Sequence, residues 1–518
     1  MSHSQTVEIM DTTLRDGEQT DGVSFSAFEK LQIARFLLEK LKVNRIEVAS
    51  ARVSAGELES VKSIFDWARE KKLDSRIEIL GFVDHRASVD WIQSAGGSVI
   101  NLLTKGSKKH CELQLGKNLS EHLADIERTV SYAADQGVKV NVYLEDWSNG
   151  YLHSPDYVLE MLRALRTMPI HRFLLPDTLG ILSPDEVKAG IGHALQSYPD
   201  LEIDFHGHND YGLATANCLA AVQAGVKGVH VAVNGLGERA GNAPLEAVVT
   251  ALHDKLGVQT SVEEKAITDA SRLVETFSRK RISTNRPIVG TDVFTQTAGI
   301  HADGDKKHNL YANPILPERF GRQRVYALGK LAGKASVANN LTALGIELPP
   351  EQEKALLEKI KELGERKETV TADDLPFLIE DLFGGLQTRF VRITDVKILT
   401  EIKQSPSAEL SLEVDGKEFR SSASGDGGYD AFMNALANIA TEIHLELPEL
   451  VDYEVRIPPG GKTDALVETV ITWKTRDGSS AFRTVGVDSD QMIAAVKATE
   501  KMLNRLFISN PAMASKAL

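Results

Sequence analysis

The first half of the 518-residue chain alternates short β-type runs with longer amphipathic runs, and it does so eight times. Eight strands that each lead into a helix, within about 250 residues, predict a (β/α)₈ TIM barrel. A doubly wound open sheet is the alternative, and it is disfavoured because no glycine-rich phosphate loop follows the first run. The β-type runs are 7–13, 44–50, 76–82, 98–104, 139–146, 172–178, 202–208 and 228–235.

The runs between these strands are typical of amphipathic helices, as in 26–41 and 154–168. Ser154-Pro155 and Ser183-Pro184 predict two helix N-termini. In each, serine is expected as the N-cap and proline as the first helical residue.

The alternation ends after about Glu275, and a chain of this length is too long for one hydrophobic core. Residues 276–389 combine a basic stretch with helix-like runs such as 349–367, which predicts small helical subdomains. Residues 390–518 contain two β-rich units, each followed by a helix, which predicts an α+β domain with an internal pseudo-repeat. We therefore expect domains at 1–275, 276–389 and 390–518.

The composition narrows the class of protein. The net charge of −14 argues against non-specific binding to nucleic acid. No apolar run approaches membrane-spanning length, and Met1 to Thr6 does not resemble a signal peptide. Cys111 and Cys218 are too few for a disulfide framework and fit a reducing compartment. We expect a soluble cytoplasmic protein with neither nucleic-acid nor membrane partners.

Polar residues gather where the predicted strands end, which is where barrel enzymes place their active sites. His206 and His208 are one residue apart in an extended run, so their imidazoles lie on one face, while Phe205 faces the outer helices. The other polar strand ends are 11–19, 144–147, 176–178 and 234–242.

Two imidazoles and a carboxylate from another strand end can form a half-open site for a divalent metal, with Zn²⁺, Mn²⁺ and Mg²⁺ all possible. Asp16, just past the first strand and beside Arg15, is the predicted carboxylate. The alternative is that both histidines are structural and bind backbone carbonyls.

Three motifs, DTTLRDGEQ (11–19), HGHND (206–210) and NGLGERAGN (234–242), follow one another at these strand ends. Together they resemble the metal-dependent TIM-barrel family of 2-isopropylmalate, homocitrate and citramalate synthases and 3-hydroxy-3-methylglutaryl-CoA lyase. The segments GFVD, LLTKGS, VYLEDWSNG, RPIVGTDVFTQTAGIHADG and DYEVRIPPGGKTDALVET are most similar to long-form (R)-citramalate synthases. The tail from about 390 resembles their leucine-type regulatory domain, so the likeness covers nearly the whole chain.

The resemblance implies a Claisen-type condensation, in which acetyl-CoA as co-substrate adds to the keto carbon of a metal-bound 2-oxo acid before thioester hydrolysis. Arg15 would stabilise the keto oxygen and the enolate. Glu145 would position or move protons, and Thr178 would donate to the substrate carboxylate. Asn242 would line or complete the metal shell.

His301 and Tyr311 lie outside the predicted barrel. In the family such residues reach the active site of the partner subunit, where the histidine assists proton transfer. The resemblance therefore implies a homodimer with shared active sites. For Tyr311, ordinary packing is the alternative.

The side chain of the 2-oxo acid is expected to meet Leu80, Leu103 and Tyr143, all bulky. They favour pyruvate and hence (R)-citramalate, a step of isoleucine biosynthesis. The alternative is 2-oxoisovalerate, which gives 2-isopropylmalate in leucine biosynthesis. These residues could also be simple barrel core. A single methylene changes selectivity by only ~1–3 kcal/mol, so several residues must act together.

Two basic groups are candidates for the phosphates of acetyl-CoA, with solvated surface as the alternative reading of each. They are Lys105, Lys108 and Lys109 after the fourth strand, and Arg279, Lys280 and Arg281.

By resemblance, the C-terminal domain binds a branched-chain amino acid as feedback inhibitor, isoleucine in a citramalate route and leucine in an isopropylmalate route. A dimerisation domain with an ordinary core is the alternative. The residues expected to line the effector pocket are Tyr429, Leu450, Tyr453, Ile457 and Val467.

Three other classes are less favoured. A hydroxyacyl-CoA lyase would use the same barrel, but the long C-terminal extension favours a synthase. A carboxyltransferase is disfavoured because the sequence has no biotin-carrier MKM motif. A non-catalytic amino-acid-binding regulator is opposed by the intact Arg15, Asp16, His206 and His208.

Overall fold

The computed structural model describes residues 6–297, 313–344, 346–365, 370–383, 391–414, 416–456, 467–476 and 481–509. These residues form two compact units, one of residues up to Phe294 together with 313–324 and one of the remainder. Three predicted site residues, His301, Tyr311 and Ile457, lie outside the described residues.

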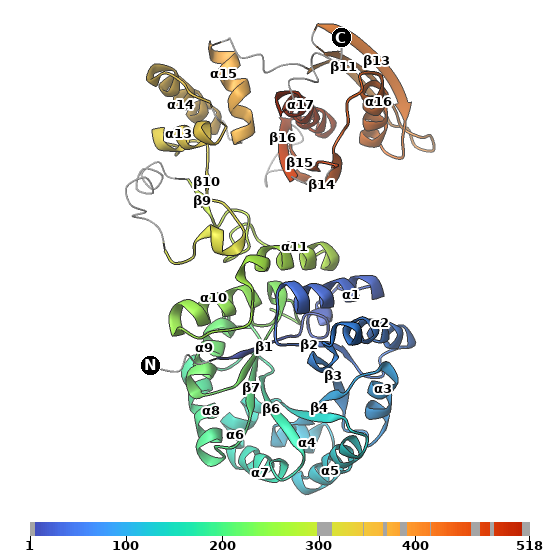
Figure 1. Ribbon diagram of the computed structural model, residues 1–518, viewed down its shortest axis with the longest axis vertical. Coiled ribbons are helices and arrows are strands. Elements are labelled where there is room, and N and C mark those ends of the chain that lie inside the picture. The colour runs from blue at the N-terminus through green and yellow to red at the C-terminus, as the bar shows by residue number, and fades with distance from the viewer. Residues whose placement is uncertain are drawn as a thin grey trace. The chain divides into compact units, whose positions relative to one another are not determined.

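The first unit is a closed barrel of eight parallel strands in sequence order, and the ring closes where β1 pairs with β8. One or two helices follow each strand on the outside (Figure 1). The predicted TIM barrel is thereby confirmed. The strands are β1 Glu8–Asp11, β2 Arg45–Ser50, β3 Ile77–Phe82, β4 Val99–Lys105, β5 Lys139–Glu145, β6 Ile170–Asp177, β7 Ile203–Gly207 and β8 Gly228–Val231.

The barrel helices cover the strands in the same order. They are α1 Ala27–Arg35, α2 Ala55–Lys71, α3 Ala87–Ala95, α4 Lys108–Leu113, α5 Leu119–Asp135, α6 Trp147–His153, α7 Pro155–Leu165, α8 Pro184–Ser197, α9 Ala214–Ala224, α10 Leu245–Leu256 and α11 Ile267–Ser278.

The predicted helix starts differ in how they are capped. At α8 the side chain of Ser183 accepts from the backbone N–H of Glu186 and the Glu186 carboxylate accepts in return, a complete capping box. At α7 Ser154 is the N-cap and Pro155 the first helical residue, as predicted, but the Ser154 side chain makes no capping hydrogen bond. Its hydroxyl instead donates to the carbonyl of Gly150 in the preceding helix.

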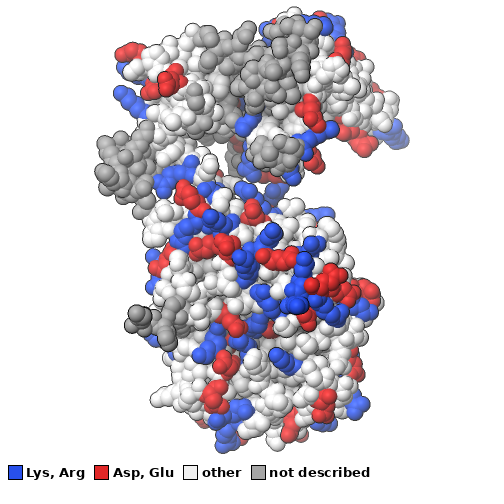
Figure 2. Space-filling model, viewed as in Figure 1, with Lys and Arg blue, Asp and Glu red and all other residues white. Residues whose placement is uncertain are grey.

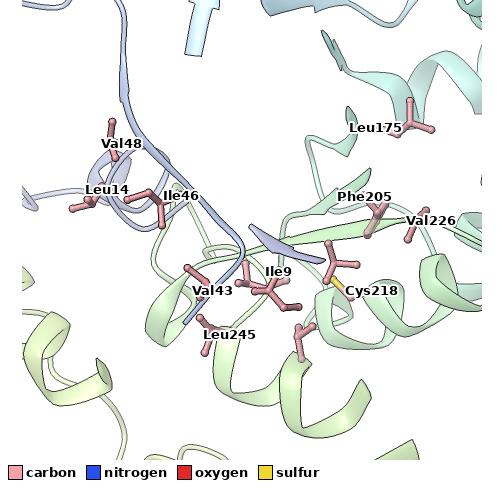
Figure 3. Packing of buried hydrophobic residues seen from close by; sticks show 14 of the residues in the cluster. Ile9, Leu14, Val43, Ile46, Val48, Leu175, Phe205, Cys218, Val226 and Leu245 are labelled. Carbon is pink, nitrogen blue, oxygen red and sulfur yellow. The ribbon is translucent and has the colours of Figure 1, made fainter. Parts of the chain in front are cut away.

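The main hydrophobic core lies between the strands and the outer helices. On β7, Ile203 and Phe205 are fully buried in it, and Figure 3 shows Phe205 beside Val226 and Cys218. Because successive strand residues point to opposite faces, this outward packing turns Asp204 and His206 into the barrel.

The barrel interior is unusually polar for a fold whose interior is ordinarily filled by branched apolar side chains. Arg45 on β2 reaches across to Asp204 on β7, and its guanidinium also donates to Glu78 at 2.8 Å. Arg172 donates to Asp204 at 2.9 Å and lies 2.8 Å from Glu8. Because Asp204 is fully buried, these contacts satisfy a carboxylate that water does not reach.

Outside the barrel, Figure 2 shows Lys and Arg side chains interspersed with Asp and Glu over the visible face of this unit. One such exposed pair is Arg166 with Asp200, 3.1 Å apart. Pairs of this kind contribute only ~0–1 kcal/mol, whereas loss of one partner inside the barrel would leave a buried charge without compensation.

The described residues of the second unit form a short parallel strand pair, five helices and two antiparallel three-stranded sheets. Each sheet is followed by one helix, as predicted for the two β-rich units. The elements are β9 Thr295–Gln296, β10 Val325–Tyr326, α13 Lys334–Ala343, α14 Pro350–Glu365, α15 Leu375–Phe383, β11 Val391–Leu399, β12 Ser407–Val414, β13 Lys417–Ser424, α16 Gly428–Glu442, β14 Glu449–Arg456, β15 Val467–Lys474, β16 Ala481–Asp488 and α17 Gln491–Ser509.

Among the described helices, none combines the length and the hydropathy that crossing a bilayer requires.

Arg45→Met is expected to lower the free energy of unfolding of the barrel by about 3–5 kcal/mol, because it leaves Asp204 and Glu78 buried without their shared cation. The exposed Arg166→Met should change it by less than ~1 kcal/mol. Thermal unfolding of both variants compares the two substitutions directly. Equal shifts in melting temperature would contradict a stabilising interior network.

Candidate active site

Asp16 is positioned by a tight turn directly after β1. The backbone N–H groups of Asp16 and Gly17 both donate to the carbonyl of Thr12, at 2.8 and 3.0 Å. Thr12 is itself tied to β8, since its N–H donates to Val231 at 2.8 Å. The turn therefore holds Asp16 over the carboxyl end of the barrel, where its side chain is buried.

The two predicted histidines come from β7 and the residue that follows it. His206 is inside the strand, and His208 forms an isolated bridge to Asn242 in the loop after β8. Both imidazoles are buried.

These three side chains converge. The Nε2 atom of His206 lies 3.3 Å from Asp16 Oδ2 and 3.3 Å from the Nε2 atom of His208, which is 4.0 Å from the same oxygen. Two ligands at right angles and ~2.1 Å from one ion would be ~3.0 Å apart, close to these separations. Within the described residues, this is the group of three that could hold a metal ion.

Unpartnered buried oxygen atoms support the same assignment. Asp16 Oδ1 and Asn242 Oδ1 are both buried without a hydrogen-bond partner. The amide of Asn242 is oriented by its nitrogen, which donates to the carbonyl of Leu236 at 2.8 Å. Buried polar atoms are normally satisfied, so the donor set of carboxylate, amide oxygen and two imidazoles fits a divalent cation.

The charges around the site also suit a cation. Burial alone would raise the pKa of Asp16, but the Arg15 guanidinium and His206 hold it well below its ordinary value. Burial lowers the pKa of His206, and burial with the neighbouring His206 lowers that of His208 to about 4. At neutral pH the site is therefore one carboxylate and two neutral imidazoles, which are the forms that bind metal.

Arg15 is buried beside the metal-ligand group and is held from two sides. Its guanidinium lies 3.1 Å from Asp16 Oδ2 and donates to Glu47 on β2 at 2.5 Å. Asn101 on β4 donates to the other oxygen of Glu47 at 2.8 Å. Neither Glu47 nor Asn101 was predicted from the sequence, although an acid and an amide within apolar strand runs were a signal for them.

The glycines of NGLGERAGN allow the close turn that places Asn242. Gly241 has φ +89°, and a Cβ on it would lie 2.0 Å from the carbonyl oxygen of Gly235. A Cβ on Gly237 would lie 2.3 Å from the amide nitrogen of Asn242. A larger residue at either position would displace this loop.

Glu145 and Thr178 lie at the carboxyl ends of β5 and β6. Glu145 is ion-paired with Lys105 from the end of β4, so Lys105 already has a carboxylate partner and is a poor candidate for CoA phosphates. Thr178 Oγ1 accepts from the N–H of Asp146 at 2.9 Å, which leaves its own hydrogen available to a substrate.

The other predicted phosphate-binding residues remain a prediction. Lys108, Lys109, Arg279 and Arg281 are exposed, and Lys280 is partly buried.

Leu80, Leu103 and Tyr143, predicted as one surface, form an apolar cluster inside the barrel together with Leu174, which was not predicted. The cluster adjoins the polar site, since the Tyr143 ring centroid lies 5.9 Å from Arg15 and 6.0 Å from the His206 ring.

The predicted effector residues are only partly brought together. The rings of Tyr429 and Tyr453 are 5.0 Å apart, and Tyr429 hydrogen-bonds to Thr499. Leu450 instead pairs with Trp473, six residues along β15 from Val467. Strand geometry separates those two positions by ~20 Å, so Leu450 and Val467 do not line one small pocket within a single chain.

The second unit also contains an apolar cavity, but this cavity is not a second candidate for the effector pocket. It has no polar lining for the ammonium and carboxylate groups of an amino acid, so we interpret it as part of the core. Its lining is Val391, Leu412, Val414, Leu436, Ile439, Ala440, Ile443, Leu445 and Leu503.

Comparison with known proteins finds family matches along nearly the whole chain. The HMGL-like family matches residues 6–274, the homocitrate synthase post-HMGL domain-like family 288–368, and the LeuA allosteric (dimerisation) domain 369–507. The (R)-citramalate synthase CimA of Methanocaldococcus jannaschii is 33% identical over 505 residues, covering 96% of this chain and 99% of that one. The chain belongs to the citramalate and 2-isopropylmalate synthase family.

A second relative shows what family membership establishes about the reaction and its substrate. The 2-isopropylmalate synthase of the same organism is also 33% identical, over 508 residues, covering 96% of this chain and 94% of that one. The chain is therefore an acyltransferase of the class that condenses acetyl-CoA with a 2-oxo acid. Because the two identities are equal, they do not separate the two acids.

Mn²⁺ is expected to bind the protein with one strong site that His206→Ala removes, measured by isothermal titration calorimetry. His253→Ala, at an exposed histidine outside the site, is the matched control. Because the pKa of His208 is lowered to about 4, protons compete weakly above pH 6 and the affinity should fall only as the pH drops below ~5. Undiminished binding by His206→Ala would contradict the assignment.

Proposed function

We propose that the protein condenses pyruvate with acetyl-CoA to give (R)-citramalate and free CoA, in isoleucine biosynthesis in the cytoplasm. The observation that carries this proposal is the cluster of Leu80, Leu103, Tyr143 and Leu174 directly beside Arg15 and the predicted metal ligands. Bulky side chains so close to the site favour the smallest 2-oxo acid side chain, a methyl group. The alternative, 2-oxoisovalerate to 2-isopropylmalate, requires space for an isopropyl group.

Asp16, His206 and His208 would hold a divalent ion, with Asn242 completing or lining its shell. When bound, the ion supplies Lewis acidity toward the carbonyl of the 2-oxo acid. The unpartnered oxygens of Asp16 and Asn242 support this donor set.

Arg15 would stabilise the negative charge that develops on the keto and enolate oxygens. Asp16 and Glu47 raise the pKa of its guanidinium against the effect of burial, so it stays cationic. Because those two carboxylates also fix its orientation, little reorganisation is needed when the charge develops.

Thr178 and Glu145 would act on the substrates from the ends of β6 and β5. The hydroxyl of Thr178, oriented by the N–H of Asp146, would donate to the substrate carboxylate. Glu145 would position a water or move a proton during carbon–carbon bond formation and thioester hydrolysis. Lys105 would hold the Glu145 carboxylate in place through their ion pair.

Removal of a methyl proton from acetyl-CoA would be assisted by His301 of a second copy of the chain, and Tyr311 of that copy would reach the same site. The match of residues 369–507 to a dimerisation domain supports a homodimer. We accordingly propose a catalytic barrel at 1–275, a connecting region at 276–389 that contributes to the partner's site, and a regulatory domain at 390–518.

The regulatory domain would bind isoleucine as a feedback inhibitor. The adjoining rings of Tyr429 and Tyr453 support an effector contact there. Ile457 would contribute to the pocket, and Leu450 and Val467 would both do so only if residues from two chains combine, because these two lie far apart along the β14–β15 pair.

With acetyl-CoA and Mn²⁺, pyruvate is expected to give citramalate, identified by mass spectrometry, at a kcat/KM at least tenfold above that for 2-oxoisovalerate. Isoleucine added to this assay should inhibit. A higher kcat/KM for 2-oxoisovalerate, with inhibition by leucine, would establish the alternative instead.

Arg15→Ala and His301→Ala should each abolish turnover, because each removes a group needed at every site. Mixed after unfolding and refolding together, they should recover about a quarter of wild-type activity, since half of the dimers then carry one intact site. No recovery, with heterodimers demonstrated by differently tagged chains, would exclude shared active sites.

A further inference from the structure

The hydroxyl of Tyr143 is held by a histidine from a strand three positions further round the barrel. Tyr143 Oη on β5 lies 3.0 Å from His230 Nδ1 on β8, and both residues are buried. His230 does not belong to the predicted metal-ligand group, and nothing in the proposed mechanism uses it. The contact spans the barrel interior, so it fixes the ring independently of the neighbouring strands.

The direction of this hydrogen bond follows from the next residue. His230 Nε2 lies 3.5 Å from Asp204 Oδ2, and Arg45 and Arg172 contact the same carboxylate. This contact is longer than an ordinary hydrogen bond, but the nitrogen faces an ionised carboxylate that offers no proton, so the imidazole proton is placed on Nε2. Nδ1 then accepts from the Tyr143 hydroxyl.

Tyr143 is thus anchored at its hydroxyl while its ring borders the site. The ring stands edge-on to His206, with centroids 6.0 Å apart and planes at 88°, and edge-on to His230 at 5.7 Å. The same ring packs with Leu80 and Leu174 in the interior apolar cluster. A change in its tilt would therefore change the space beside the predicted metal ligands.

We propose that His230 and Asp204 act as a positioning pair that sets which 2-oxo acids are accepted, by fixing the Tyr143 ring as the wall against the substrate side chain. This rests on the proposed condensation. Without the anchor the ring can rotate about its side-chain bonds, and a pocket that gains space for one methylene loses on the order of tenfold in discrimination.

The test compares kcat/KM for pyruvate, 2-oxobutanoate and 2-oxoisovalerate in five full-length proteins, wild type and four variants. Tyr143→Phe keeps the ring and deletes its hydroxyl, and His230→Leu deletes the acceptor. His230→Gln can still accept from Tyr143 and donate to Asp204. Tyr198→Phe deletes the hydroxyl that donates to Leu159, remote from the site, and is the control.

Tyr143→Phe and His230→Leu are expected to raise kcat/KM for the two larger acids relative to pyruvate about tenfold, while His230→Gln and Tyr198→Phe keep the wild-type ratios. The ratio of the kcat/KM values for two substrates does not change when part of the enzyme is merely unfolded. Wild-type ratios in both Tyr143→Phe and His230→Leu overturn the inference alone. A wild-type protein that consumes none of the three acids overturns the proposed function, and the inference with it.

Discussion

The pairing of β1 with β8 is the contact on which the site depends. Asp16 follows the first strand, whereas His206 and His208 belong to the seventh, nearly two hundred residues later. In an open sheet of this strand order they would stand near opposite edges. Closure brings β1 and β7 to either side of β8, and the turn anchored on Val231 then sets the Asp16 carboxylate against both imidazoles. The metal-ligand group is therefore a product of the barrel's topology and not of any local segment.

The barrel interior gives this arrangement its electrostatic setting. Buried ionic groups are costly unless they are paired, and removing one partner leaves an uncompensated charge. Here carboxylates outnumber arginines, an imbalance that a divalent cation near Asp16 would reduce. The interior charges extend from the amino-terminal ends of the strands to the site. They orient Arg15 through Glu47, and they contact Tyr143 through His230, which faces Asp204. The interior side chains in these ion pairs are Arg15, Arg45, Arg172, Glu8, Asp16, Glu47, Glu78 and Asp204.

Much of this could be predicted from the sequence, because regular alternation and strand-end motifs are local signals. The eight strands, the two-sheet C-terminal arrangement, and the convergence of Asp16 with His206 and His208 all followed from them. Contacts across the barrel could not be predicted in this way. Nothing local indicates that Lys105 pairs with Glu145, because that contact depends on the register between β4 and β5, or that His230 holds Tyr143, because that contact joins strands that are not neighbours in the barrel. Likewise, Leu450 and Val467 were both predicted to line the effector pocket, yet strand pairing places them far apart.

Anomalous X-ray diffraction from crystals grown with Mn²⁺ would show whether Asp16, His206 and His208 share one ion. One strong peak is expected in the barrel, within about 2.0–2.3 Å of Asp16 Oδ, His206 Nε2 and His208 Nε2, with Asn242 at or near its shell. A barrel with those three side chains turned apart and no peak between them, or with the ion bound elsewhere, would contradict this assignment.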